Sequence, residues 1–289
     1  MKIGDKQYSL RFDSKQWSDR VDSISRSLLQ WYRNQGRDLP WRNSQDPYCI
    51  WVSEIMLQQT QVERVKEYFH NFLLRFPTVF ELAKAEEAVV LKYWEGLGYY
   101  RRARQLHLAA KKIVSDYDGK FPQDVRALQQ LPGIGRYTAG AIASIAFDLP
   151  EPILEANSRR VLARFIHYDT PLSGNKDDQP LWDVAAAIVP RDGGAGAFNQ
   201  ALMDLGSIIC TPVSPRCEKC PLAYHCEAYQ LGSVDRIPNA PARKSSKKIK
   251  EKAYVFIHKG KLLVVRRQPG EWWEGLWDFP RGIPNQVEA

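Results

Sequence analysis

The sequence predicts a mainly α-helical catalytic region over residues 1–235, followed by a basic linker and a short β segment. Apolar residues recur at the spacing of amphipathic helices through most of residues 1–235. Prolines fall between these periodic runs, as helix breakers should. After residue 252 the pattern changes to the β-rich runs of strands. A length of 289 residues suits about two domains.

Helices are expected over seven periodic runs and one shorter stretch. The seven runs are 21–35, 54–76, 88–94, 101–117, 137–147, 158–167 and 181–189. Asp124 is placed to cap a further short helix that ends near Gln130, because an Asp side chain accepts hydrogen bonds from the free amides of a helix start.

The composition changes at about residue 236. Residues 236–252 contain seven basic residues and one acidic one, which predicts a solvated linker. The runs 254–258 and 262–266 flank Lys259-Gly260-Lys261 and predict a β-hairpin. Because only 37 residues follow Lys252, too few for an ordinary independent core, we expect an incomplete second domain over 253–289.

The composition excludes a disordered chain and a membrane-spanning one. Apolar residues make up 44% and charged residues 26%, as in folded globular proteins. There is no apolar run of about 18 residues, and the N-terminus lacks the apolar core of a secretory signal. We therefore expect a cytoplasmic protein with reduced cysteines. Residues 1–235 carry a net charge of only +1, so net charge alone does not indicate a nucleic-acid partner.

Four cysteines lie within 17 residues. They are Cys210, Cys217, Cys220 and Cys226, with the spacing C-x6-C-x2-C-x5-C. Reduced thiols this close together predict a metal site. Structural zinc sites usually pair two short C-x2–4-C hooks, and only one is present here. Four thiolates on one compact loop also suit a cubane iron–sulfur cluster, so the spacing favours iron–sulfur over zinc or buried thiols.

A glycine-rich segment lies between two helical runs. In the sequence LPGIGRYTAG, Gly133 and Gly135 allow a tight turn that exposes backbone amides at the start of the next helix. Such amides and the helix dipole bind phosphate. Arg136 and basic residues of the preceding helical run could form a basic rim beside them. The alternative is an αα-hairpin in which the glycines serve geometry alone.

These features resemble a known family. The segment LPGIGRYTAGAI is similar to the helix–hairpin–helix of the DNA glycosylase superfamily that includes endonuclease III, and the cysteine spacing resembles that of its 4Fe-4S cluster. Other segments resemble the MutY branch, the adenine DNA glycosylases. They are 39–42 (LPWR), 51–60 (WVSEIMLQQT), 94–100 (WEGLGYY) and 198–206 (FNQALMDLG).

The resemblance implies a two-lobed helical glycosylase fold. One lobe would be a six-helix barrel over about 46–148. The other would combine the N-terminal part, about 18–45, with the iron–sulfur part, about 149–232. The segment 276–280 (LWDFP) resembles the start of this branch's C-terminal Nudix-like domain, which recognises the oxidised guanine. A G-x5-E-x7-R-E array is absent from the sequence, so pyrophosphatase chemistry is not expected.

Cleaving the bond between adenine and its sugar needs an acid for the base and an anion near the sugar cation. Two carboxylates can perform both tasks. By resemblance Glu54 is the acid, and its apolar surroundings predict a raised pKa. Without the motif, an exposed helical Glu would be the simpler interpretation.

The second carboxylate departs from the family. Where the resemblance leads us to expect Leu-Asp-Gly-Asn, this chain has Leu-Glu-Ala-Asn, with Glu155 in the place of the Asp. The carboxylate of Glu reaches further than that of Asp by one methylene group, and a displacement of a catalytic group by about 1 Å can lower the reaction rate by about 100-fold. We expect Glu155 to be the anion beside the sugar, with Asn157 orienting it. A mismatch-binding protein with reduced catalysis is the alternative.

Tyr137 occupies the position at which bifunctional relatives have a Lys that attacks the sugar. A Tyr cannot form a Schiff base, so the resemblance implies a monofunctional glycosylase that uses water. The competing interpretation is an endonuclease III-like glycosylase and lyase for damaged pyrimidines. The missing Lys and the segment 272–280 argue against it.

The expected partner is duplex DNA that contains adenine opposite 8-oxoguanine or guanine. The base must be flipped out, and by resemblance Gln59 and Tyr99 wedge into the stack. The hairpin amides at Gly133 and Gly135 would hold a phosphate together with a monovalent cation. Residues matched to the adenine pocket are Trp41, Arg42 and Gln200. We expect a monomer with no membrane partner.

Overall fold

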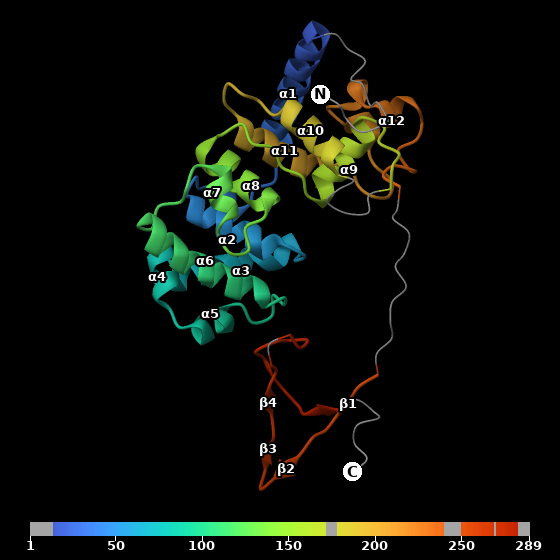
Figure 1. Cartoon of the computed structure of the whole chain (residues 1–289). Helices are drawn as coiled ribbons and strands as arrows, with labels where there is room; N and C mark the ends of the chain where they lie inside the picture. The colour runs from blue at the N-terminus through green and yellow to red at the C-terminus, as the bar shows by residue number, and fades with distance from the viewer. Residues whose placement is uncertain (1–13, 172–177, 240–249, 269, 283–289) are drawn as a thin grey trace. The chain divides into compact units, whose positions relative to one another are not determined.

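The computed structural model describes residues 14–171, 178–239, 250–268 and 270–282. The chain divides into two compact units, 1–241 and 242–289. The first unit is helical and the second contains short strands (Figure 1), so the prediction of a mainly α fold is confirmed. None of the described helices is both long and apolar enough to cross a membrane.

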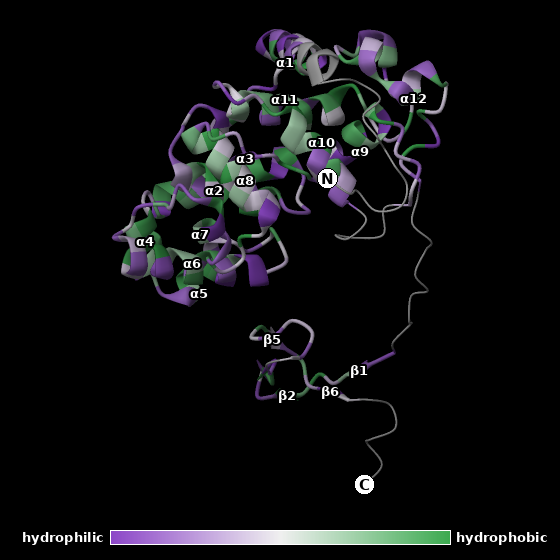
Figure 2. Cartoon of the chain, turned by 45° about the horizontal axis from the view of Figure 1, so that its top comes forward, coloured by the Kyte–Doolittle hydropathy of each residue, from purple (hydrophilic) through white to green (hydrophobic). Residues whose placement is uncertain are grey.

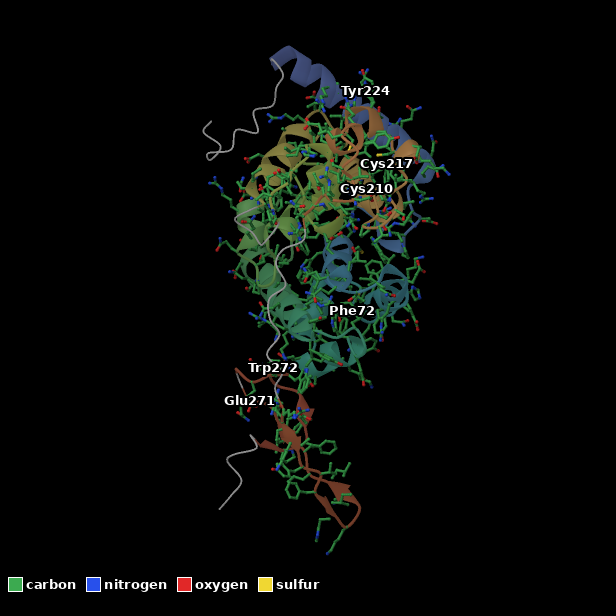
Figure 3. The ribbon with its side chains drawn as sticks, turned by 90° about the vertical axis from the view of Figure 1, so that its right-hand side faces the viewer. Phe72, Cys210, Cys217, Tyr224, Glu271 and Trp272 are labelled. Carbon is green, nitrogen blue, oxygen red and sulfur yellow. The ribbon has the colours of Figure 1, made fainter. Side chains whose placement is uncertain are left out.

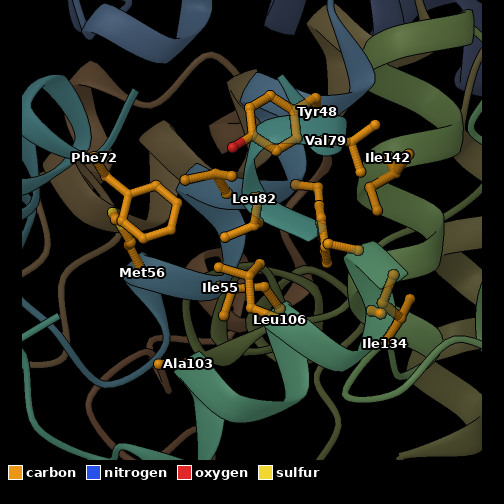
Figure 4. Packing of buried hydrophobic residues seen from close by; sticks show 14 of the residues in the cluster. Tyr48, Ile55, Met56, Phe72, Val79, Leu82, Ala103, Leu106, Ile134 and Ile142 are labelled. Carbon is orange, nitrogen blue, oxygen red and sulfur yellow. The ribbon is translucent and has the colours of Figure 1, made fainter. Parts of the chain in front are cut away.

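One lobe of the helical unit surrounds an aromatic core. Its helices are α2 (Pro47–Leu57), α3 (Val62–Arg75), α4 (Val79–Lys84), α5 (Glu87–Tyr93), α6 (Arg101–Tyr117), α7 (Val125–Gln129) and α8 (Arg136–Phe147). Trp51, Phe72 and Trp94 are completely buried in this core. Figure 4 shows Met56 beside Phe72, with Leu82 in the same cluster of buried side chains. Close packing of α2 against α8 and of α4 against α6 holds the lobe together.

The other lobe is assembled from both ends of the helical unit. It contains α1 (Ser14–Gln35), α9 (Ala156–Phe165), α10 (Gln179–Ile188), α11 (Ala195–Ile208) and α12 (Glu227–Gln230). Helix α1 packs on α11, so Ile24 and Leu28 share a buried core with Phe198. Helix α11 also packs on α8 of the first lobe. Figure 2 shows α11 as mainly hydrophobic.

The predicted helix over 54–76 was wrong, because this run forms two helices. Helix α2 ends at Leu57 and α3 begins at Val62. Between them Gln59 has φ 56°, a left-handed conformation that ends a right-handed helix. Both helices bury residues in the same core, so the apolar periodicity continues across the break.

Three further helices, α4, α11 and the four-residue α12, were absent from the sequence prediction. Helix α4 has only six residues. Helix α11 is apolar around most of its circumference, so it lacks a clear amphipathic period. The capping prediction is confirmed, since the Asp124 carboxylate accepts a 2.8 Å hydrogen bond from the amide of Ala127 at the start of α7.

The described part of the second unit consists of three antiparallel strand pairs. They are β1 (Lys252–Ala253) with β6 (Arg281–Gly282), β2 (Ile257–His258) with β3 (Lys261–Leu262), and β4 (Val265–Arg266) with β5 (Trp277–Asp278). The predicted hairpin is confirmed at Lys259-Gly260, where both residues have positive φ, as in a two-residue hairpin turn.

The strands of this unit are shorter than the sequence predicts, and β4 pairs with β5 instead of extending the hairpin. None of the described residues between 250 and 282 is buried. Phe256, Ile257 and Trp272, for example, are more than half exposed. The described part of the unit therefore lacks a core of its own. Most of the predicted linker, and the end of the predicted Nudix-like segment, lie outside the described residues.

Candidate active site

Packing of α2 against α8 brings Glu54 and Tyr137 into contact, although 83 positions separate them in sequence. The Tyr137 hydroxyl donates a 2.5 Å hydrogen bond to Oε2 of Glu54. Tyr137 is the second residue of α8 and lies directly after the glycine-rich turn. Glu54 is 5% exposed, so the burial predicted from its apolar neighbours is observed.

Burial raises the pKa of Glu54 to about 7. The hydrogen bond from Tyr137 and the charge of Arg42 act in the opposite direction, whereas the negative charge of Glu155 raises this pKa further. A carboxyl group that titrates near neutral pH can both donate and accept a proton, which is what general acid–base catalysis needs.

Glu155 is the N-cap residue of α9. Its Oε1 accepts a 2.7 Å hydrogen bond from the amide of Ser158, and its Oε2 accepts one of 2.8 Å from the amide of Asn157. Ser158 Oγ in turn accepts a hydrogen bond from the amide of Glu155, which completes a reciprocal capping box. Both carboxylate oxygens are thereby held by backbone amides at the positive end of the α9 helix dipole.

Asn157 connects this carboxylate to the cysteine-rich loop. Its Nδ2 donates to Glu155 Oε2 at 3.3 Å, and its Oδ1 accepts from Arg160 Nη2 at 2.9 Å. Arg160 also donates to the backbone oxygens of Cys210 and Gly206, both at 2.7 Å. The two contacts fix which side of the Asn157 amide faces the carboxylate. Arg160 was not among the residues that the sequence predicted.

The residues predicted for the base pocket lie together. Trp41, Arg42 and Gln200 line a narrow cavity of about 50 Å³ together with Glu54. Trp41 comes from the 3₁₀ turn Pro40–Arg42 and packs edge-on against Phe69. Gln200 lies on α11, so the pocket is lined by residues from both lobes.

Asp204, which the sequence analysis missed, holds Arg42 in place. Its completely buried carboxylate accepts hydrogen bonds of 2.6 and 2.9 Å from the Arg42 guanidinium and one of 2.7 Å from Arg37. Burial acts to raise the pKa of Asp204, but the two arginines outweigh it and the pKa lies below its usual value. The available signal was an acidic residue in the middle of an otherwise apolar helix.

The two predicted wedge residues share a rare backbone conformation. Gln59 has φ 56° and Tyr99 has φ 47°, and each left-handed residue other than glycine costs about 1–2 kcal/mol. Both side chains are exposed, Tyr99 by 63%. Together with Gly133 they line a groove of about 420 Å³.

The glycine-rich turn borders the same groove. Gly133 has φ 76°, and a Cβ atom there would lie 2.7 Å from Cβ of Gln105, so both conformation and space require glycine. Gly135 immediately precedes α8 and would meet nothing within 4 Å. The Arg136 guanidinium lies 3.9 Å from the centre of the Trp182 ring and donates to Gln179, both on α10. Contacts from the other lobe therefore hold this exposed arginine.

All four clustered cysteines are free and half-buried. Burial first, and then the neighbouring sulfurs, raise the pKa of Cys220 to about 12 and that of Cys226 to about 11. Arg164 donates a 3.3 Å hydrogen bond to the sulfur of Cys210. Figure 3 shows Cys210 and Cys217 close together after α11, beneath the exposed Tyr224.

The side chains as placed do not form a metal-ligand group anywhere in the described ranges. The donor set nevertheless fits an iron–sulfur cluster in chemistry. Burial first, and then the neighbouring thiols, raise the pKa of Cys217, Cys220 and Cys226, so these thiols would release their protons beside a strong positive charge, which cluster iron provides. The cysteines are therefore suited to an iron–sulfur cluster as ligands.

Two segments of the chain match known protein families. Residues 52–180 match the HhH-GPD superfamily base excision DNA repair protein, and residues 210–226 match the iron–sulfur binding domain of endonuclease III. The fold aligns with a thermostable thymine-DNA glycosylase at a TM-score of 0.67 and 31% identity, over 76% of this chain and 100% of that one. The fold and site therefore define a DNA glycosylase with an iron–sulfur binding domain.

Relatives with higher sequence identity show which kind of DNA glycosylase this chain resembles. The chain is 38% identical to the adenine DNA glycosylase of Buchnera aphidicola (subsp. Schizaphis graminum) over 89% of this chain and 74% of the relative. It is 44% identical to the adenine DNA glycosylase of Mycolicibacterium smegmatis over 72% of each chain. The chain belongs to the adenine DNA glycosylase family and is a base excision repair enzyme that acts on adenine.

Proposed function

We propose that this enzyme hydrolyses the N-glycosidic bond of adenine mispaired with 8-oxoguanine or guanine in duplex DNA, and that it leaves an intact abasic site. The observation that carries the proposal is the contact between Glu54 and Tyr137 within the electrostatic field of Glu155. It combines a proton donor with pKa about 7, a neutral phenol and a carboxylate capped by backbone amides at one site.

Glu54 is the proposed general acid. A proton passes from its carboxyl group to the adenine ring as the bond between base and sugar breaks, so the base leaves as a neutral molecule. The resulting Glu54 carboxylate then accepts a proton from the water that adds to the sugar. The same group thus donates one proton and recovers one, and the carboxyl is regenerated.

Glu155 is the proposed anion beside the sugar. Positive charge develops on the sugar only as the bond breaks, so a fixed negative charge there stabilises the transition state more than the bound substrate. Both carboxylate oxygens accept hydrogen bonds from the start of α9. A carboxylate has about four acceptor positions, so this capping leaves its charge available to the sugar. Asn157 orients the carboxylate.

Tyr137 takes no covalent part. Burial and then the charge of Glu54 raise its pKa well above the usual value, so the hydroxyl stays neutral and positions Glu54. Without an amine at this position, water is the nucleophile and strand cleavage does not follow. This supports the monofunctional reaction.

DNA is proposed to lie across the groove that contains Gln59, Tyr99 and Gly133. The first two would enter the stack as the adenine is flipped into the cavity lined by Trp41, Arg42 and Gln200. The amides near Gly133 and Gly135, with Arg136 and a monovalent cation, would hold a backbone phosphate. We further propose that the enzyme acts as a monomer in the cytoplasm.

We propose that Cys210, Cys217, Cys220 and Cys226 hold one 4Fe-4S cluster. When bound, the cluster would cross-link the loop through four iron–thiolate bonds. Arg164 and Arg160 hold the same loop from α9 through its sulfur and backbone atoms. Residues 253–289 are proposed to begin a Nudix-like domain that recognises the opposite base.

Single-turnover excision on an adenine:8-oxoguanine duplex, with borohydride trapping in parallel, tests the proposal. We expect adenine release, an alkali-labile abasic product and little covalent protein–DNA adduct. Strong trapping would instead support a lyase of the endonuclease III type. Mismatch binding without any excision would support a mismatch-binding protein, in which Glu155 occupies the position of the family's Asp but does not perform its catalytic role.

A further inference from the structure

The guanidinium of Arg102 joins two turns that are about 40 residues apart in the chain. Arg102 is the second residue of α6. Its Nη1 donates to three carbonyl oxygens at the end of α2, those of Ile55 at 2.8 Å, Met56 at 3.0 Å and Gln58 at 2.5 Å. These contacts lie immediately before Gln59.

The second nitrogen, Nη2, faces both turns. It donates to Oγ1 of Thr60 and to the carbonyl oxygens of Leu97 and Gly98, each at 3.2 Å. The guanidinium carbon also lies 5.7 Å from the centre of the Tyr99 ring. The same planar group therefore contacts the residues on both sides of Gln59 and those immediately before Tyr99.

These contacts suit arginine and no other side chain. The last carbonyls of a helix have no partner within it and carry partial negative charge, which a cation satisfies. Only a guanidinium presents five donors in a rigid plane, so it can serve two turns at once. The ammonium group of a lysine at the same position would keep the positive charge but lose the planar arrangement of donors that reaches both turns.

The turns need such support because both central residues are strained. Gln59 and Tyr99 have left-handed backbones without being glycine, and a backbone of this kind persists only where the surroundings hold it. The side chains of both residues are exposed, so burial of these side chains does not hold the two backbones. The half-buried Arg102 is the group that their two turns share.

We infer that Arg102 is a positioning residue that holds Gln59 and Tyr99 as one rigid pair for insertion into the DNA stack. The inference rests on the proposed wedge role of these two residues. Arg102 itself acts through them and through the turns that carry them. Its loss should therefore affect base extrusion more than the stability of the fold.

The test compares Arg102→Lys with Arg104→Lys in the full chain. Arg104 lies on the same helix and pairs with Glu87 at 3.3 Å, so its variant controls for loss of an α6 guanidinium. Extrusion is followed with 2-aminopurine placed beside the target adenine, opposite a strand containing 8-oxoguanine, at saturating protein. Excision is followed in a single turnover, and thermal melting monitors the fold.

We expect Arg102→Lys to lose at least about half of the emission increase and to lower excision by about 10-fold or more, because small misplacements lower rates strongly. Arg104→Lys should keep both signals. If Arg102→Lys retains full emission and excision, the inference is wrong. If Arg102→Lys does not fold, Thr60→Val removes one acceptor and should show a smaller loss of emission; an unchanged emission would overturn the inference.

A double-mutant comparison separates this inference from the wedge role itself. The pair Gln59→Ala and Tyr99→Ala should lower emission, and adding Arg102→Lys to it should lower emission little further, because groups that act as one unit are not additive. Fully additive losses would mean that Arg102 acts elsewhere. If the Ala pair leaves extrusion unchanged, the wedge role is wrong and the inference on Arg102 falls with it.

Discussion

The hydroxyl of Tyr137 donates a 2.5 Å hydrogen bond to Oε2 of the buried Glu54, so a phenol that cannot form a Schiff base also adjusts the proposed acid. This bond lowers the pKa of Glu54, against the larger effect of burial. The pKa of Glu54 therefore depends on the packing of α2, which carries Glu54, against α8, which carries Tyr137.

Tyr137→Phe should shift the pH dependence of excision upward. Removing the donor removes an interaction that favours the charged carboxylate, so the pKa of Glu54 should rise above about 7. An acid catalyst is lost as the pH rises through its pKa, and the alkaline limb of the rate profile should move to higher pH. Single-turnover rates between about pH 5 and pH 9 measure this. An unmoved alkaline limb would mean that another group limits the reaction.

Glu54→Gln should stabilise the fold, and more so at higher pH. In the parent, the unfolded chain loses this proton near pH 4.5 and the folded chain near pH 7, so stability falls as the pH rises between these values. The Gln variant lacks this loss and should gain up to about 3 kcal/mol at pH 8 relative to pH 4. Urea unfolding at both pH values checks the sign. A gain that is independent of pH would contradict the raised pKa.

Glu155→Gln should lower single-turnover excision by at least about 100-fold while duplex affinity stays nearly unchanged, because the lost charge acts on the transition state. Its amide nitrogen would also face one of the two amides that the carboxylate caps. We expect a loss of about 1 kcal/mol in stability from this mismatch. Full activity in this variant would remove Glu155 from the mechanism.

Glu155→Asp is the matched control, because it keeps the charge and is a favourable N-cap residue. We expect melting close to that of the parent and a rate equal to it or higher, since the shorter carboxylate restores the family's pattern. A rate more than about 10-fold lower would show that the backbone at Ala156 is built for the longer side chain.

Purified protein should be yellow-brown and contain about four irons per chain, because four thiolates on one loop suit a cubane cluster. Cys217→Ser should lower folded yield or DNA affinity more than the excision rate of the protein that folds. Cys49→Ser, outside the loop, should leave the iron content unchanged. Metal analysis that finds zinc and no iron would contradict the cluster assignment.

Asp204→Asn should be strongly destabilising. The variant removes the charge that Arg37 and Arg42 share in a completely buried site, and breaking such a group typically costs about 3–5 kcal/mol. Glu63→Gln, which breaks an exposed ion pair with Lys66, should change stability by less than about 1 kcal/mol. Chemical unfolding of both variants tests the contrast. A mild effect of Asp204→Asn would mean that water replaces the lost contacts.

Several features of this protein could be predicted from local sequence, because their physical causes are local. The amphipathic run 101–117 is helix α6, and Asp124 caps the helix that follows it. The residues of a motif also appear together in the structure. Glu54 and Tyr137 are in contact, and the charge of Glu155 acts on Glu54, so residues that the family resemblance had grouped lie near one another.

Tertiary structure decided what depends on partners far away in the chain. The break at Gln59 is held by Arg102, and the orientation of Arg42 is set by Asp204, 162 positions later. Neither contact could be predicted from the periodicity of the sequence. Whether a buried polar group is stable depends on a hydrogen-bond partner that can lie anywhere else in the chain. The sequence by itself determined most of the helices, the cluster of cysteines and the catalytic candidates. Only tertiary packing determined the pKa of Glu54 and the strained turns that face the groove, because burial and mutual contact arise when helices distant in sequence meet.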